Sequence, residues 1–216
     1  MDQQIILAVN DNGKFLEYIP KETGHKGVGK RHLAIAVLLQ NSKGQVLLQK
    51  RKHQIFDNLW DITGATHPLH KPHYCHSERN EESVPKEIAT SPAAPRNDKK
   101  CKICNQDDVD ETLEEATKRC LAEEWGINEI RDIKILGEFN YFAKYNDFCE
   151  NEAEPLFCEN EHCAMIMGKY DGAVKINPEM GYEYKWMDKE EFLKDIEQNP
   201  KNYTPWAIKS LEFLKR

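Results

Sequence analysis

The sequence has no long hydrophobic run. No stretch approaches the roughly 18 apolar residues of a membrane-spanning helix. The first residues, MDQQIILAVNDNG, also lack the basic region and long apolar run of a secretory signal. These absences predict a cytoplasmic protein that does not enter a membrane.

The chain also lacks an excess of positive charge. Lys and Arg number 30 against 37 Asp and Glu, which gives a formal net charge of -7. This argues against a general nucleic-acid-binding protein, because such proteins attract phosphates with a basic surface. The seven cysteines are an odd number, and reduced thiols are the simplest interpretation. A local basic pocket for a small anion remains compatible with the composition. The composition is also compatible with either a monomer or a homodimer.

The order of the predicted elements indicates a mixed α+β protein. Apolar β-rich runs between turn residues predict strands at 5–9, 15–19, 33–39, 45–49, 60–63, 133–145, 162–170 and 182–187. Helices are predicted over 111–125, 189–196 and 205–214, after the capping residues Asp110, Asp188 and Thr204. A length of 216 residues suits one domain, or one domain with an insertion, in which helices cover a sheet.

Residues 69–109 have a different composition. The stretch from Pro68 to Val109 holds five of the ten prolines and shows almost no apolar periodicity, which predicts an irregular insertion in a surface loop. Its segments CHSERNEES and TSPAAPRND resemble the translation of a mobile palindromic DNA repeat found inside bacterial reading frames. The alternative is a structural zinc site, because a Cys-x-x-Cys pair with a distant Cys and His is a zinc-binding pattern. Its ligands would be Cys75, His76, Cys101 and Cys104.

Residues 111–127, ETLEEATKRCLAEEWGI, carry several carboxylates at helical spacing. Positions 120, 123 and 124 share a helix face, where neighbouring carboxylates can hold Mg²⁺, an ion that prefers oxygen ligands and bridges to phosphate. A solvated acidic helix is the alternative interpretation. The segment resembles the second half of the Nudix box, although Cys120 stands where the box has its first paired glutamate. The matching positions are Glu111, Arg119, Leu121, Glu123, Glu124, Gly126 and Ile127.

This resemblance implies the Nudix fold, a mixed β-sheet flanked by helices in an α/β/α sandwich, as a single domain over residues 1–216. The segment WDITGATHP resembles the strand and loop that precede the box, so the insertion at 69–109 lies inside the loop of the box itself. Within that family, the chain resembles type 1 isopentenyl-diphosphate isomerases over nearly its whole length apart from the insertion.

The isomerase resemblance implies a set of site residues. A divalent metal, Zn²⁺ or Mn²⁺ by the chemistry of its ligands, is expected at His25, His32, His67, Glu159 and Glu161. A Mg²⁺ ion is expected at Glu124, with Glu123 as the second box carboxylate. The diphosphate of a small-molecule substrate is expected at Lys21 and Arg51. The catalytic residues implied are Glu161, Tyr141 and Trp206, whose ring would stabilise a carbocation. Either aromatic residue can instead be an ordinary core residue.

One position departs from the isomerase pattern. That family has a catalytic cysteine two residues before the metal-binding histidine, and here the residue is Ala65. Alanine cannot transfer a proton, so we predict an isomerase-like enzyme, impaired by Ala65, that interconverts isopentenyl and dimethylallyl diphosphate. Two alternatives stay open. One is a Mg²⁺-dependent Nudix hydrolase of a nucleoside or other organic diphosphate, and the other is an inactive diphosphate-binding homologue.

Overall fold

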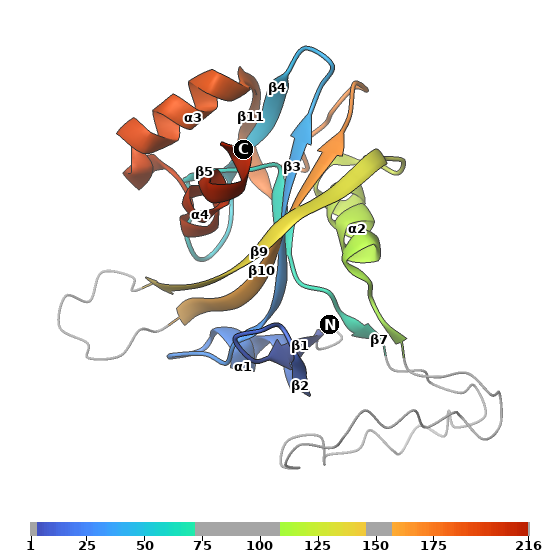
Figure 1. Cartoon of the computed structure of the whole chain (residues 1–216), viewed down its shortest axis with the longest axis vertical. Coiled ribbons are helices and arrows are strands. Elements are labelled where there is room, and N and C mark those ends of the chain that lie inside the picture. The colour runs from blue at the N-terminus through green and yellow to red at the C-terminus, as the bar shows by residue number, and fades with distance from the viewer. Residues whose placement is uncertain (1–3, 72–108, 146–156, 216) are drawn as a thin grey trace.

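A curled, mixed β-sheet forms the centre of the computed structural model, which describes residues 4–71, 109–145 and 157–215 (Figure 1). The strands are β1 (Ile5–Val9), β2 (Phe15–Pro20), β3 (His32–Gln40), β4 (Gln45–Arg51), β5 (Trp60–Asp61), β6 (Gly64–Thr66), β7 (His70–Lys71), β8 (Val109–Asp110), β9 (Arg131–Tyr145), β10 (Phe157–Lys169) and β11 (Gly181–Asp188). The helices are α1 (Lys21–His25), α2 (Leu113–Trp125), α3 (Lys189–Gln198) and α4 (Pro205–Leu214), with a 3-10 turn, η2, at Pro200–Asn202.

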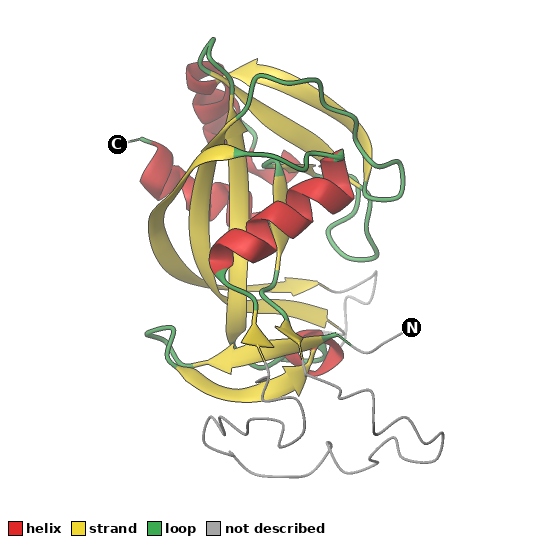
Figure 2. Cartoon of the chain, turned by 90° about the vertical axis from the view of Figure 1, so that its right-hand side faces the viewer, coloured by secondary structure: helices red, strands yellow, loops and turns green. Residues whose placement is uncertain are grey.

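Strand β3 is the axis of the sheet. It pairs in parallel with β10 and antiparallel with β6, β1 and β4. Because side chains alternate along a strand, Ala34, Ala36 and Leu38 enter one core cluster with α3 and α4, while Ile35, Val37 and Leu39 enter another with α2. The sheet is therefore covered on both faces, as Figures 1 and 2 show. The predicted α+β sandwich is confirmed.

The prediction for the start of α2 was wrong by two residues. Thr112 is the N-cap, and it forms a capping box in which its hydroxyl accepts from the Glu115 backbone N–H at 3.2 Å and the Glu115 carboxylate accepts from the Thr112 N–H at 2.8 Å. Asp110 lies in β8 and pairs with His70 at 2.9 Å. Both residue types favour N-caps, and the reciprocal bonds with Glu115 favour Thr112. The helix ends at Gly126, whose φ of 66° is left-handed.

Both ends of the predicted insertion, residues 69–109, contribute to short strands. Residues 70–71 of β7 pair with residues 109–110 of β8, and Leu69 packs against the cluster formed by Ile6, Ala8 and Ile19. The predicted zinc ligands at 75, 76, 101 and 104 lie outside the described residues. None of the helices in the described ranges is long and apolar enough to cross a membrane.

The strand pairing makes the insertion hypothesis testable. Lys71 and Val109 face each other across β7 and β8, so a short Gly/Ser loop can replace residues 72–108 and join two neighbouring chain ends. We expect the melting temperature to change by less than about 4 °C, which corresponds to roughly 1 kcal/mol in a protein of this size.

The matched control replaces residues 69–109, the bounds predicted from composition. It removes both short strands and Leu69 and should destabilise the protein clearly more. A large loss of stability in the 72–108 variant, or loss of one tightly bound zinc per chain, would instead assign a structural role to the segment.

Candidate metal centre and substrate pocket

Three histidines and a glutamate from distant parts of the chain meet at one end of the sheet. They come from the end of α1, the start of β3, the segment after β6, and β10. The potential ligand atoms of His25, His32, His67 and Glu159 all lie within 4.8 Å of one another. The three imidazole ring centroids are 4.6 to 4.9 Å apart. Four of the five residues expected at the divalent metal are therefore together, and Glu161 borders them.

Hydrogen bonds orient two of the imidazoles. His25 Nδ1 lies 3.1 Å from the Cys158 carbonyl oxygen, and His32 Nδ1 lies 2.7 Å from the Lys30 carbonyl oxygen. Such bonds fix the tautomer and leave Nε2 free as a ligand. Three buried nitrogens of the cluster have no hydrogen-bond partner among the described residues: His25 Nε2, His32 Nε2 and His67 Nδ1. Glu159 Oε2 lies 3.1 Å from His25 Nδ1. Unpaired buried polar atoms are unfavourable, and three nitrogens with a carboxylate suit Zn²⁺ or Mn²⁺.

Glu161 connects this cluster to an aromatic residue. Its Oε1 lies 3.0 Å from His67 Nε2, and its Oε2 accepts the Tyr141 hydroxyl at 2.5 Å. Burial favours the protonated acid, but hydrogen bonds and charges from His32 and His67 outweigh it and hold the pKa of Glu161 well below its usual range. Burial and the neighbouring Glu161 raise the pKa of Tyr141. The phenol therefore stays protonated as a donor to the carboxylate.

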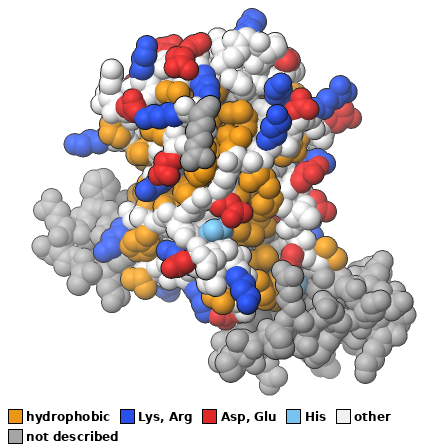
Figure 3. All heavy atoms as spheres, in the orientation of Figure 1, with side chains coloured by type: hydrophobic (Ala, Val, Ile, Leu, Met, Phe, Trp, Pro, Cys, Tyr) orange, Lys and Arg blue, Asp and Glu red, His pale blue; other side chains and the backbone are white. Residues whose placement is uncertain are grey.

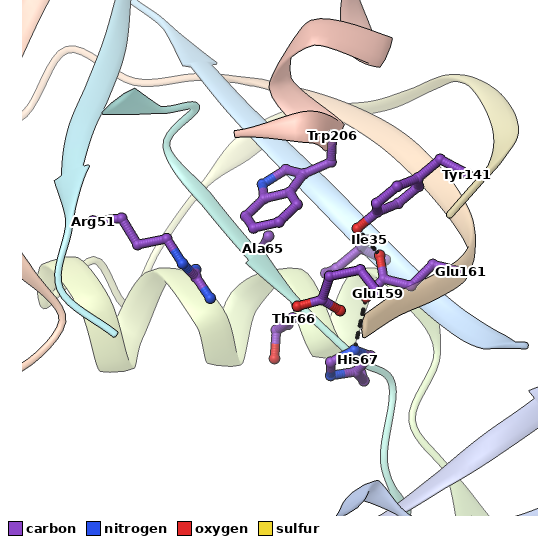
Figure 4. A pocket seen from close by; sticks show the side chains of 9 residues that line it. All are labelled: Ile35, Arg51, Ala65, Thr66, His67, Tyr141, Glu159, Glu161 and Trp206. Atoms are coloured by element: carbon purple, nitrogen blue, oxygen red, sulfur yellow. Dashed lines mark hydrogen bonds and ion pairs between the residues drawn. The ribbon is translucent and has the colours of Figure 1, made fainter. Parts of the chain in front are cut away.

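A pocket opens beside Glu161 (Figure 4). Its lining residues are Ile35, Arg51, Ala65, Thr66, His67, Tyr141, Glu159, Glu161 and Trp206. Figure 4 shows the indole of Trp206 over Ala65, with Tyr141 pointing to Glu161 and Arg51 reaching in from the far side. The pocket thus has a polar wall of histidine and carboxylate, an apolar centre and a cation at the opposite end.

Predicted cations lie on one side of this pocket. Arg51 lines it directly, whereas Lys21 is outside the lining and its ammonium donates to Gln4 at 3.2 Å. Burial lowers the pKa of Lys21. The charges of Glu159, Arg119 and Arg51 also affect this pKa, so Lys21 lies close to these three residues.

The sequence analysis did not consider His53, an exposed residue whose pKa is lowered to about 4 by partial desolvation and by the charges of Arg51 and Lys21. Its Nδ1 accepts the Ile55 N–H at 3.3 Å, which leaves Nε2–H as a neutral donor in the same region. The sequence signal for His53 was its position two residues after the predicted cation Arg51.

The two box carboxylates have different environments. Glu124 is buried and accepts from Gln49 Nε2 at 2.9 Å and from the Cys120 thiol at 3.2 Å. Burial raises the pKa of Glu124 to about 7. Glu123 is exposed and pairs with Arg119 at 3.3 Å. It is absent from the metal-ligand cluster found among the described residues, so its predicted role as a ligand stays a prediction.

A glycine brings Glu124 close to the strand that carries Ala65. A Cβ atom at Gly64 would lie 2.7 Å from Cys120 Sγ and 3.1 Å from Glu124 Oε2. The first of these distances is shorter than real Cβ contacts, so β6 can approach α2 this closely only with glycine at this position.

Arg119 stabilises the contact between α2 and the segment after β6. Its guanidinium pairs with Glu111 at 3.0 Å and donates to the His67 carbonyl at 2.8 Å. Arg119 thus ties α2 to the segment that carries a cluster histidine.

Comparison with known proteins defines the class. The sequence model of the NUDIX domain family matches residues 106–207, a region that starts at the end of the predicted insertion. A crystal structure of DR0079 from Deinococcus radiodurans superposes with a TM-score of 0.59 at 16% identity, covering 99% of this chain and 100% of that one. Residues 106–207 are therefore similar to the NUDIX domain, and the chain shares the fold of the DR0079 structure.

Comparison with individual relatives gives a more specific result than the domain match. The chain is 22% identical over 208 residues to the isopentenyl-diphosphate Delta-isomerase of Enterobacter sp. (strain 638), covering 95% of this chain and 88% of that protein. It is 27% identical over 213 residues to the isopentenyl-diphosphate Delta-isomerase of Halobacterium salinarum, covering 94% of this chain and 76% of that protein. The resemblance to this enzyme family therefore extends over nearly the whole chain.

Proposed function

We propose that this protein is an isopentenyl-diphosphate isomerase-like Nudix enzyme, acting on a C5 isoprenoid diphosphate, whose turnover is limited by Ala65. The observation that supports it most is the cluster of His25, His32, His67 and Glu159 beside a pocket lined by Glu161 and Trp206. Relatives named isopentenyl-diphosphate isomerase match the chain along nearly its full length.

Each part of the pocket has a role in this proposal. Arg51, with Lys21 nearby, binds the diphosphate, and Glu124 lies close enough to feel the charge of Arg51. Glu161 exchanges a proton with the C5 chain, and the hydroxyl of Tyr141 holds one oxygen of that carboxylate. The face of Trp206 stabilises positive charge on the carbon skeleton by cation–π attraction, while its buried ring excludes water from the reacting atoms.

The donor sets fit two divalent ions. The histidine cluster, with three buried nitrogens that make no hydrogen bond among the described residues, fits Zn²⁺ or Mn²⁺ held by His25, His32, His67 and Glu159, with Glu161 beside them. The carboxylate of Glu124 fits Mg²⁺ shared with a diphosphate. Bound ions would supply positive charge that stabilises anionic groups of the substrate and of the protein.

Ala65 is the reason to expect low turnover. It lines the pocket next to Trp206, and it stands at the position where the resemblance to the isomerases implies a cysteine. The loss of this acid/base group also favours the hydrolase alternative. Against that alternative, Cys120 replaces one box carboxylate and Glu123 turns to Arg119, which leaves Glu124 alone in the buried position.

One assay separates the alternatives. The purified protein is incubated with isopentenyl diphosphate and Mg²⁺, and dimethylallyl diphosphate and free phosphate are measured in the same samples. Slow formation of dimethylallyl diphosphate without phosphate supports the proposal. Release of phosphate, or turnover of another organic diphosphate only, supports the hydrolase.

The metal centre gives a prediction that does not depend on turnover. Replacing His67 with alanine should weaken binding of Zn²⁺ or Mn²⁺ at least about 100-fold, the upper end of the loss for an outer-shell partner, because a ligand contributes more. Competition with a chelator measures the affinity. His70→Ala is the matched control, since His70 pairs with Asp110 outside the cluster. Equal affinity in both variants would contradict the assignment.

A further inference from the structure

A buried carboxylate lies behind the pocket and outside its lining. Asp61, at the end of β5, is fully buried. Its Oδ1 accepts the backbone N–H of Ile62 at 2.8 Å and the hydroxyl of Thr204 at 2.8 Å. Its Oδ2 has no hydrogen-bond partner among the described residues and lies 3.8 Å from Nη1 of Arg51. A buried charge is unfavourable unless it is paired, so the guanidinium is the compensating group.

The same carboxylate is joined to the helix that carries the aromatic wall. Thr204 is the N-cap of α4, but its hydroxyl makes no cap bond and instead donates to Asp61. Its backbone N–H donates to the Trp60 carbonyl at 3.0 Å. The beginning of α4 is therefore fastened to β5 by two bonds, and Trp206 follows two residues later. The indole N–H of Trp206 is buried and meets no acceptor with normal hydrogen-bond geometry among the described residues, but it lies close enough to Asp61 to help lower the pKa of that carboxyl.

Arg51 completes the arrangement. Its guanidinium carbon lies 5.0 Å from the centroid of the Trp206 ring, within the roughly 6 Å of a cation–π contact. Arg51 and Trp206 both line the pocket, whereas Asp61 does not. Two pocket groups from opposite halves of the chain thus share one buried anion.

We propose that Asp61 is a positioning residue: its carboxylate holds the guanidinium of Arg51 against Trp206 and so sets the distance between the cationic end and the aromatic wall of the pocket. The geometry matches a ligand with a diphosphate at one end and a short apolar chain at the other. Burial raises the pKa of Asp61 to about 6, and the charge of Arg51 is the largest influence that opposes this. The ligand part of the inference rests on the proposed function.

Asp61→Asn is the sharpest test. The amide keeps an acceptor for Ile62 and Thr204 but turns a donor toward the guanidinium. Inorganic pyrophosphate, with Mg²⁺ present, is the calorimetric probe. We expect its affinity to fall roughly 10-fold or more, because small displacements of a binding group have effects of this size or larger. Added to Arg51→Gln, the same change should cause no further loss, since Asp61 acts through Arg51.

Controls separate this role from general support of the fold. Asp195→Asn is the matched variant, because Asp195 accepts the hydroxyl of Tyr203 beside the start of α4 and is not part of the pocket lining. It should bind pyrophosphate like the unmodified protein. The double variant Asp61→Asn with Arg51→Gln contains no unpaired charge and guards against failure to fold. An unchanged affinity in Asp61→Asn, or an equal loss in both backgrounds, overturns the inference.

A crystal structure of Asp61→Asn decides the question without a ligand. We expect the Arg51 guanidinium to lie beyond the roughly 6 Å of a cation–π contact with Trp206, and an unmoved guanidinium overturns the inference. If the unmodified protein binds no pyrophosphate, the proposed diphosphate site is wrong. The position of Arg51 in the Asp61→Asn crystal structure then still supports or overturns the role of Asp61.

Discussion

Replacing Ala65 with cysteine should raise isopentenyl diphosphate isomerisation at least about 10²-fold, the lower end of the contribution of one positioned acid or base. Ala65 lines the pocket and lies under Trp206, so a thiol there would enter the space beside the substrate. Nearby metal charge and histidine would favour its ionisation. Steady-state production of dimethylallyl diphosphate measures the gain.

Ala65→Ser is the matched control, because its side chain has nearly the same size but does not ionise near neutral pH. It should leave turnover close to that of the unmodified protein. Robust activity in the unmodified protein that cysteine does not improve would show that another residue performs the missing proton transfer. Inactivity in every variant, with phosphate released from another diphosphate, would favour the hydrolase.

Glu161→Gln should lower isomerase turnover by about 10²–10⁴, most visibly in the Ala65→Cys background. The amide has the volume of the carboxylate but cannot take up or release the proton. The carboxylate is bound by Tyr141 and His67 and faces the pocket, so the change acts where the substrate would react. Turnover and bound metal are measured together, because a loss of both would indicate a ligand role alone.

A second glutamine variant provides the comparison. Glu138, on β9, pairs with His162 at 3.2 Å and is not part of the pocket lining. Glu138→Gln should keep turnover within a few-fold of its parent. If Glu161→Gln behaved like this control, with metal still bound, proton transfer would have to be assigned to another residue.

Local patterns were enough to predict most of the elements. Apolar, β-rich runs next to turn residues predicted β3 and β4 to within two residues at each end, and Asp188 was correctly identified as the cap of α3, where it accepts from the Glu190 and Glu191 N–H groups. These features depend on residues a few positions apart, which the sequence displays directly. The start of α2 was misplaced because Asp110 and Thr112 are both capping residues, and only the bond to Glu115 distinguishes them.

The sequence alone determined the identity of the chemical groups: three histidines and paired glutamates in the order of a Nudix protein, and an alanine at one decisive position. Only the tertiary structure decided which of them meet. His25 and Glu159 are 134 positions apart in the printed sequence, and they come within ligand distance because Lys26, directly after α1, bridges to Phe157 at the start of β10. Asp61 had no motif to mark it, and its contacts with Arg51 and Thr204 exist only because β5 lies between β4 and the start of α4. Burial, which sets the charge of such groups, is a property of the packed sheet and helices and cannot be read from neighbouring residues.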